Sequence, residues 1–146
     1  MTTQPTSGVQ SPAKQPGRGA ATYSSNLNSL LAGMIARTPG AVHAVMATVD
    51  GVQIAISAGL PPERADQLAT IGAGLLSIAD GAGIMMNTGS PRHVVVEMYG
   101  GLLLAAPVAP RVVLSLLAAE NADRERLGFE LAQFAGLVTP HVAHIV

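Results

Sequence analysis

The stretch LPPERADQLATIGAGLLSIADGAGIMM, residues 60–86, decides the fold because it predicts one long helix with two apolar stripes. Steps of three and four residues define the first stripe, which comprises Ala65, Leu68, Gly72, Leu75, Ala79, Ala82 and Met86. The same steps define the second stripe, which comprises Ile71, Gly74, Ile78, Gly81 and Met85. Because an α-helix repeats about every 3.6 residues, the two stripes cover roughly half of its surface. A helix on a sheet needs one stripe, so we expect the other to face a partner, with Gly72, Ala79 and Ala82 allowing a second helix to approach.

The residues before this helix predict a shorter helix and a β-hairpin. The helix is expected over residues 24–37, where leucines recur with helical spacing. Two apolar runs follow, residues 42–49 and 52–57, joined by Asp50-Gly51. Asp-Gly between apolar runs favours a two-residue hairpin turn in which both residues have positive φ.

The residues after the long helix predict three strands and a last helix. The strands are expected over residues 92–98, 102–106 and 111–118, with a turn at 107–110 between the last two. Asp123 is a suitable cap for the last helix, which we expect Pro140 to kink or end. Its predicted apolar side comprises Leu127, Leu131, Phe134, Val138 and Val142.

The predicted order is therefore αββαβββα, an α/β sandwich of the α+β kind with a five-stranded antiparallel sheet and helices on both faces. The first and last helices are expected on one face and the long helix on the other. Residues 92–98 contain three consecutive valines, and at a sheet edge such a strand is a template for pairing with another chain. We expect this strand and the long helix to form one dimer or partner interface. Its candidate residues are Leu68, Ile71, Gly72, Leu75, Ile78, Ala79, Val94, Val95 and Val96.

The composition separates an N-terminal tail from one apolar domain. Residues 1–22 are rich in Thr, Gln, Pro, Ser and Gly, which predicts a disordered tail followed by a domain over 23–146. The chain is 49% hydrophobic and 12% charged, against an ordinary charged share of about 25%. Its uncharged runs are too short or too rich in proline for a membrane span, which needs about 20 apolar residues. Burial against protein is the expected use of the surplus apolar surface.

Several kinds of chemistry are disfavoured by the residues that the chain contains. There is no cysteine, which fits a cytoplasmic location and rules out thiolate metal sites. With a net charge of -1 and few aromatic residues, nucleic-acid binding is not expected. The chain has no lysine after Lys14, so the domain cannot form the phosphate loop of a GTPase. His141 and His144 are three residues apart, but we favour their placement at a helix end over a metal site, and we expect no cofactor.

Glu97 and Glu130 are carboxylates in apolar surroundings, and two interpretations of them stay open. They lie either on a solvated sheet face and a polar helix face, or on a surface that faces a partner. Six arginines of the domain could in principle reach a partner's phosphate, but nothing in the sequence selects one of them. We assign no catalytic residue.

The order of several short matches resembles the roadblock/dynein-light-chain family, and within it the bacterial MglB-like members. The matching stretches are Leu27–Leu31, Pro39-Gly40, His43–Val45, Asp50-Gly51, Ala65–Ala69, Gly74–Ser77, Val95–Met98, Gly100-Gly101, Gly128–Leu131 and Pro140-His141. The resemblance implies a roadblock/profilin-like fold that homodimerises through its second helix and third strand. It also implies a small Ras-like GTPase as partner, in an actinobacterial signalling module with a sensor-kinase-like protein.

Three functions are compatible with these residues and with the resemblance, and all three stay open. The first is a non-enzymatic homodimeric regulator or adaptor that binds the GTPase and modulates its hydrolysis. The second is a scaffold that holds a sensor-kinase-like protein near its GTPase without affecting the nucleotide. The third, a small-molecule sensor, needs polar groups that converge on a ligand, and the sequence offers few. A cytoplasmic protein recruited to the membrane by its partners, without insertion of its own, is expected for the first two.

Overall fold

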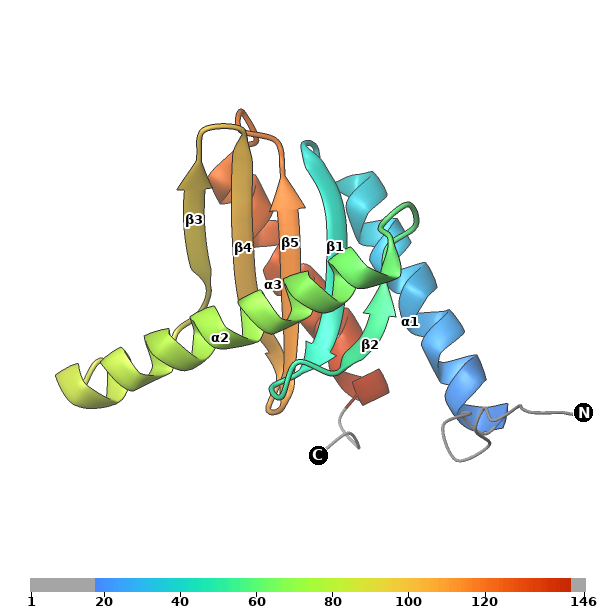
Figure 1. The fold of residues 1–146 in the computed structure, drawn as a ribbon, viewed down its shortest axis with the longest axis horizontal. Helices are drawn as coiled ribbons and strands as arrows, with labels where there is room; N and C mark the ends of the chain where they lie inside the picture. The colour runs from blue at the N-terminus through green and yellow to red at the C-terminus, as the bar shows by residue number, and fades with distance from the viewer. Residues whose placement is uncertain (1–17, 143–146) are drawn as a thin grey trace, which may run out of the picture.

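The computed structural model describes residues 18–142, with side chains from Asn26 onward, as eight elements in the predicted order (Figure 1). They are α1 (Arg18–Arg37), β1 (Ala41–Thr48), β2 (Gln53–Ile56), α2 (Pro62–Met86), β3 (Val94–Met98), β4 (Gly101–Ala109), β5 (Val112–Ala118) and α3 (Arg124–Val142). Residues 1–17 of the predicted tail lie outside the described residues. Residues 18–22 belong to α1, which begins six residues before the expected position 24.

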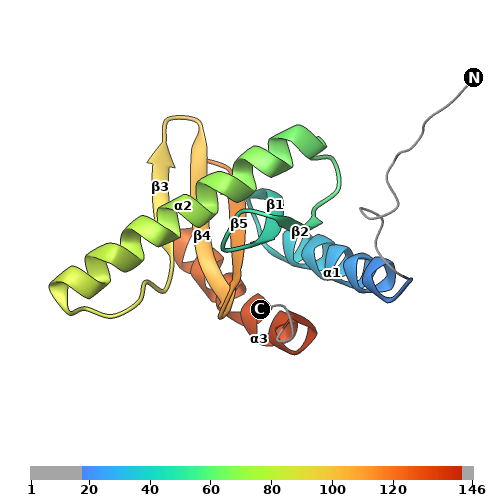
Figure 2. The same cartoon turned by 60° about the horizontal axis from the view of Figure 1, so that its bottom comes forward.

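The five strands form one antiparallel sheet in the order β2-β1-β5-β4-β3. Helices α1 and α3 cover one face and α2 crosses the other diagonally (Figures 1 and 2). The predicted sandwich, the predicted distribution of the helices and the edge position of β3 are all confirmed. β2 forms the opposite edge of the sheet.

The larger core lies between the sheet and the pair α1 and α3. All five apolar residues predicted for α3 are buried there, together with Leu27, Leu31 and Met34 of α1. The Asp123 carboxylate accepts hydrogen bonds from the backbone N–H groups of Glu125 (3.0 Å) and Arg126 (3.3 Å), so it caps α3 as predicted. A smaller core forms under α2, around Val45, Leu68 and Leu103.

The turn of the first hairpin differs from the predicted one. Gly51 has a φ of 87°, but Asp50 is not among the residues with positive φ. The Gly51 N–H donates to the Thr48 carbonyl (2.9 Å), and the pairing of β1 with β2 shifts register between Met46 and Ala47. A longer loop with one left-handed glycine matches the strand twist in the same way as the expected two-residue turn, so one positive φ suffices.

The structure corrects the predicted turn at 107–110 and shows that Pro140 does not end the last helix. Residues 107–109 belong to β4 and not to a turn. β3 begins with Val94 opposite Ala105, so Pro107, which cannot donate a backbone hydrogen bond, has a strand on one side only. Pro140 lies inside α3, which continues to Val142. Val138 and Val142 are fully buried, and the Thr139 hydroxyl lies 3.0 Å from the Val108 carbonyl oxygen, so packing holds the last turn in helical form.

The close approach of α2 to the sheet depends on Gly72. A Cβ added at this position would lie 2.9 Å from the Ser115 Cβ and within bonding distance of its hydroxyl oxygen. Gly128 of α3, by contrast, has no atom within 4 Å of an added Cβ.

We expect Gly72→Ala to lower the free energy of unfolding by about 1–3 kcal/mol, because the strand side chain beneath the helix must move. Gly128→Ala is the matched control and should be neutral or raise stability by up to about 1 kcal/mol, because alanine favours the helix. Urea unfolding of the two variants measures the difference. Equal stability changes would contradict the close contact.

Candidate interaction site

Helix α2 has one face on its own sheet and one face free. The buried residues of the helix are Ala65, Leu68, Ala69, Gly72, Ala73, Leu76 and Gly83. Leu68 is 6% exposed and Gly72 contacts Ser115, so both lie against the sheet of their own chain. They are not available to a partner, and we drop these two from the candidate interface. The sheet-facing side of α2 therefore consists of the N-terminal part of the first predicted stripe and the neighbouring row formed by Ala69, Ala73 and Leu76.

The second stripe is the free one; the sequence predicted only that one of the two stripes would face a partner. Ile71 is 50% exposed, Ile78 74% and Met85 76%, and nothing lies within 4 Å of a Cβ added at Gly74 or Gly81. Two further candidate residues, Leu75 and Ala79, lie at the border between the two faces and are half-buried.

The C-terminal part of α2 extends past the edge of the sheet beyond β3 (Figures 1 and 2). Its 25 residues make a helix about 37 Å long. Five strands at roughly 4.8 Å spacing span only about 19 Å. After Ala79 the helix has a single buried residue, Gly83, which contacts the backbone of Gly89 in its own following loop.

In this extension one large exposed apolar residue, Ile84 at 73%, belongs to neither predicted stripe. The stripes follow helical spacing alone, whereas a comparison of the helix length with the width of a five-stranded sheet would have indicated that this end of the helix projects.

The edge strand β3 places its valines on both faces of the sheet. Val94 and Val96 pack toward the α2 side, and Val95 packs against the core under α1 and α3. All three are half-buried, because β3 has a neighbouring strand on one side only. The free edge of β3 and the free face of α2 are therefore neighbours, which is the juxtaposition that the sequence predicted.

A cleft of about 530 Å³ lies beside α2, between the helix and the β4–β5 turn. Its apolar wall includes Leu76, Val112 and Pro110. The polar side chains of its lining are Ser77, Asp80 and Ser90. Three polar groups at the rim of a largely apolar cleft give a small molecule few oriented contacts.

The two glutamates that the sequence singled out lie in different environments. Glu97 of β3 is exposed, and its carboxylate lies 2.8 Å from the guanidinium group of Arg124, the first residue of α3. Glu130 is buried, which corrects the expectation of a solvated helix face. Its carboxylate contacts Arg126 at 3.1 Å and Arg37 at 3.8 Å, so burial is compensated by two cations.

The described histidines do not come together. His93 is exposed, and His43 is partly buried with its Nδ1 unpartnered. Within residues 18–142, no group of three His, Asp or Glu residues is arranged to hold a metal ion. His144 lies outside the described residues, so the predicted pair with His141 is not placed.

Among the described helices, α2 alone is long and apolar enough to cross a membrane by length and composition. Its most apolar window has a mean hydropathy of 1.5 and is 28% buried in the chain. Such a helix is weak evidence for a span, since core helices of soluble proteins have the same composition. Here one face of α2 packs on the sheet over the first half of its length.

Residues 27–118 match the Roadblock/LC7 domain, which covers more than half of the chain. The chain therefore belongs to the Roadblock/LC7 family. A Roadblock/LC7 domain from Streptomyces avermitilis is 33% identical, with a TM-score of 0.76 over 80% of this chain and 97% of that one. None of the curated proteins matches the sequence.

More distant solved structures share the fold. MglB of Myxococcus xanthus is 14% identical, with a TM-score of 0.71 over 82% of this chain and 97% of that one. Profilin IB of Acanthamoeba castellanii is 13% identical, with a TM-score of 0.56 over 77% of this chain and 96% of that one. The roadblock/profilin-like architecture predicted from the resemblance is confirmed.

We expect Glu97→Gln to change the free energy of unfolding by less than about 1 kcal/mol, because an exposed ion pair is screened by water. Glu130→Gln is the comparison variant and should cost about 1–3 kcal/mol, because it weakens charge-assisted bonds to a buried group. Thermal unfolding of both variants at one ionic strength measures the two effects. A larger loss for Glu97→Gln would contradict this ranking.

Proposed function

We propose that the protein is a non-enzymatic, homodimeric regulator or adaptor that binds a small Ras-like GTPase. Its membership of the Roadblock/LC7 family supports a regulatory or adaptor role. The formation of a dimer and the binding of a GTPase are more specific than this role and are our own inferences. The observation that carries the dimer is the extension of α2 past the free edge of β3.

A second copy paired along β3 would explain this extension. Two β3 strands in antiparallel pairing would join the two sheets, and the end of each α2 would then lie over the sheet of the other copy. The exposed side chains of Ile78, Ile84 and Met85 would lose contact with water in that arrangement. Burial stabilises by about 25 cal/mol per Å² of apolar surface, so this face favours association.

The candidate interface for this dimer comprises Ile71, Leu75, Ile78, Ala79, Val94, Val95 and Val96. Val95 contributes through its position in the edge strand, since its side chain packs toward α3. A protein partner also suits α2 better than lipid does, because Asp80 lies near the middle of its exposed half and a lipid interior disfavours a carboxylate. We place the dimer in the cytoplasm, with membrane recruitment through partners.

The GTPase partner is inferred from the family resemblance. Because the chain has no lysine after Lys14, its domain cannot form the phosphate loop of a GTPase itself. We infer that the chain supplies no catalytic group and that any influence on hydrolysis acts through the GTPase's own residues. The alternative is a scaffold that joins the GTPase to a sensor-kinase-like protein. A small-molecule sensor is less favoured, because the cleft beside α2 has three polar side chains in its lining.

We expect Ile78→Glu to convert the dimer into a folded monomer. A carboxylate at this exposed position leaves the single chain intact but would be buried without a partner charge in the dimer. Light scattering should give the mass of one 14.8 kDa chain for the variant and twice that mass for the parent.

Val52→Glu is the matched control, since Val52 is 62% exposed but lies before β2, at the opposite side of the sheet from β3. It should leave the dimer unchanged. A parent protein that is monomeric at 100 µM, or an Ile78→Glu variant that stays dimeric, would contradict the dimer proposal.

The GTPase proposal predicts capture of a small Ras-like GTPase from the lysate of the source organism by the immobilised chain. Capture with a non-hydrolysable GTP analogue and not with GDP would support a regulator that recognises the switch regions. Equal capture with both nucleotides would favour the scaffold. Absence of a GTPase in both would remove the GTPase from the proposal and leave the dimer untouched.

A further inference from the structure

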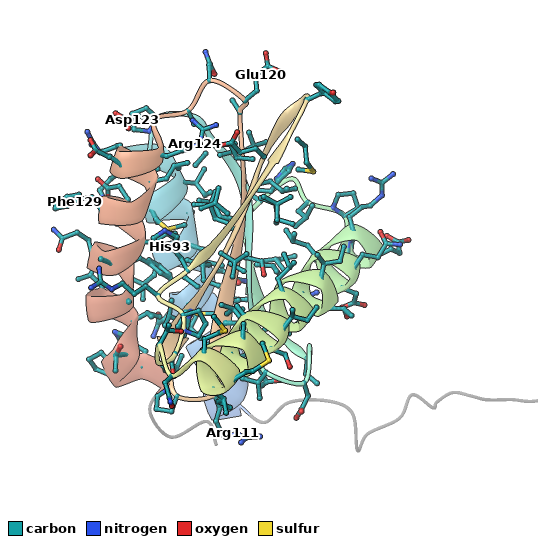
Figure 3. The ribbon with its side chains drawn as sticks, turned by 90° about the vertical axis from the view of Figure 1, so that its left-hand side faces the viewer. His93, Arg111, Glu120, Asp123, Arg124 and Phe129 are labelled. Atoms are coloured by element: carbon teal, nitrogen blue, oxygen red, sulfur yellow. The ribbon has the colours of Figure 1, made fainter. Side chains whose placement is uncertain are left out.

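The outer surface of α1 and α3 carries a second candidate interaction surface, on the opposite face of the sheet from α2 (Figures 1 and 3). Phe129 is 58% exposed and Leu137 is 51% exposed. Together with Gln133 they are spaced four residues apart, so they form one line along α3. Phe129 points away from the sheet (Figure 3).

A cationic cluster borders this line. Arg37 of α1 and Arg126 of α3 share the single buried carboxylate of Glu130, so the cluster has a surplus positive charge. Both arginine side chains are about half exposed. Arg126 directs its Nε toward Glu130 and one Nη toward the Arg37 carbonyl, which leaves further N–H donors for another acceptor.

The cluster opens onto a hollow of about 370 Å³ between the two helices. Arg37, Glu130, Gln133, Gly136 and Leu137 line it. The other carboxylate of α3, Glu125, lies in the first turn, four residues before Phe129, and so borders the N-terminal end of the apolar line; it does not line the hollow, which is about two turns away. A ligand in the hollow would therefore meet the Arg37 guanidinium group and the apolar side chain of Leu137.

We propose that this surface binds an acidic, amphipathic segment of a partner protein, with a carboxylate at the arginines, one large apolar side chain against Leu137 and a second against Phe129. Charge complementarity selects the acid, since guanidinium groups bind carboxylates in a bidentate manner. The exposed apolar line on α3 favours a segment that is amphipathic, because one side of that segment must contact apolar side chains.

The same features disfavour an anionic membrane as the occupant. Lipid-binding surfaces of this kind typically carry four or more basic residues, whereas this surface has two arginines that share one glutamate. The proposal does not depend on the dimer, because α1 and α3 lie on the other side of the sheet from the free face of α2. One molecule could hold both kinds of partner together, as an adaptor does.

The test is selection of peptides from a random 16-residue phage-displayed library on the immobilised full-length protein, followed by anisotropy titrations of the enriched peptides. We expect enriched peptides to carry Asp or Glu about one helical turn from a large apolar residue. Their affinity should fall as NaCl rises, since the attraction is partly between charges.

Gln133 provides a matched pair of charge variants, because it is exposed and both replacements favour helix. Gln133→Glu should weaken binding about fivefold and Gln133→Lys should strengthen it severalfold, from the sign of the added charge. Gln67→Glu, the same substitution on an exposed position of α2, should leave the affinity unchanged.

Three results would overturn the proposal. In the first, the selection enriches no peptide. In the second, the enriched peptides contain no acidic residues. In the third, the peptides bind equally well to the two Gln133 variants. Binding to phosphatidylglycerol vesicles that depends on the charge at Gln133, without peptide binding, would assign the surface to membranes instead.

Discussion

The contact between α2 and the sheet is the constraint on which the rest of the structure depends. Ala65, Ala69, Gly72 and Ala73 have small side chains or none, so the helix lies close to the strands and Gly72 sits directly over Ser115. This close packing directs one side of α2 to its own chain. Everything else that is apolar on the helix then has no partner within the chain, and the surplus becomes a surface for association.

The length of α2 adds a second consequence to the same contact. A helix of about 37 Å is longer than the width of about 19 Å of the five-stranded sheet that it crosses, and its end projects beyond β3 (Figure 1). The free edge of β3 and the projecting helix are adjacent, and a second copy would satisfy both at once. The opposite face is different in kind, because α1 and α3 bury the main core there and leave a mixed cationic and apolar surface outside.

The elements that the sequence predicted well are those that local rules govern. Helical spacing identified the buried side of α3 residue by residue, and Asp123 caps that helix because its side chain meets its own backbone N–H groups. The prolines were predicted less well, since the penalty for Pro140 is local but packing of Val138 and Val142 outweighs it. Pro107 is tolerated because the neighbouring strand β3 begins only opposite Ala105, and no local sequence pattern contains that information.

The sequence by itself determined the order of elements, the family resemblance and the existence of more apolar helix surface than one sheet can cover. Apolar periodicity carries that information, because it records which residues avoid water. Only the tertiary structure decided which side of α2 faces the sheet, and so removed Leu68 and Gly72 from the candidate interface. It also decided that Glu130 is buried between two arginines. Both outcomes depend on contacts between residues far apart in the chain, and spacing along one segment cannot record them.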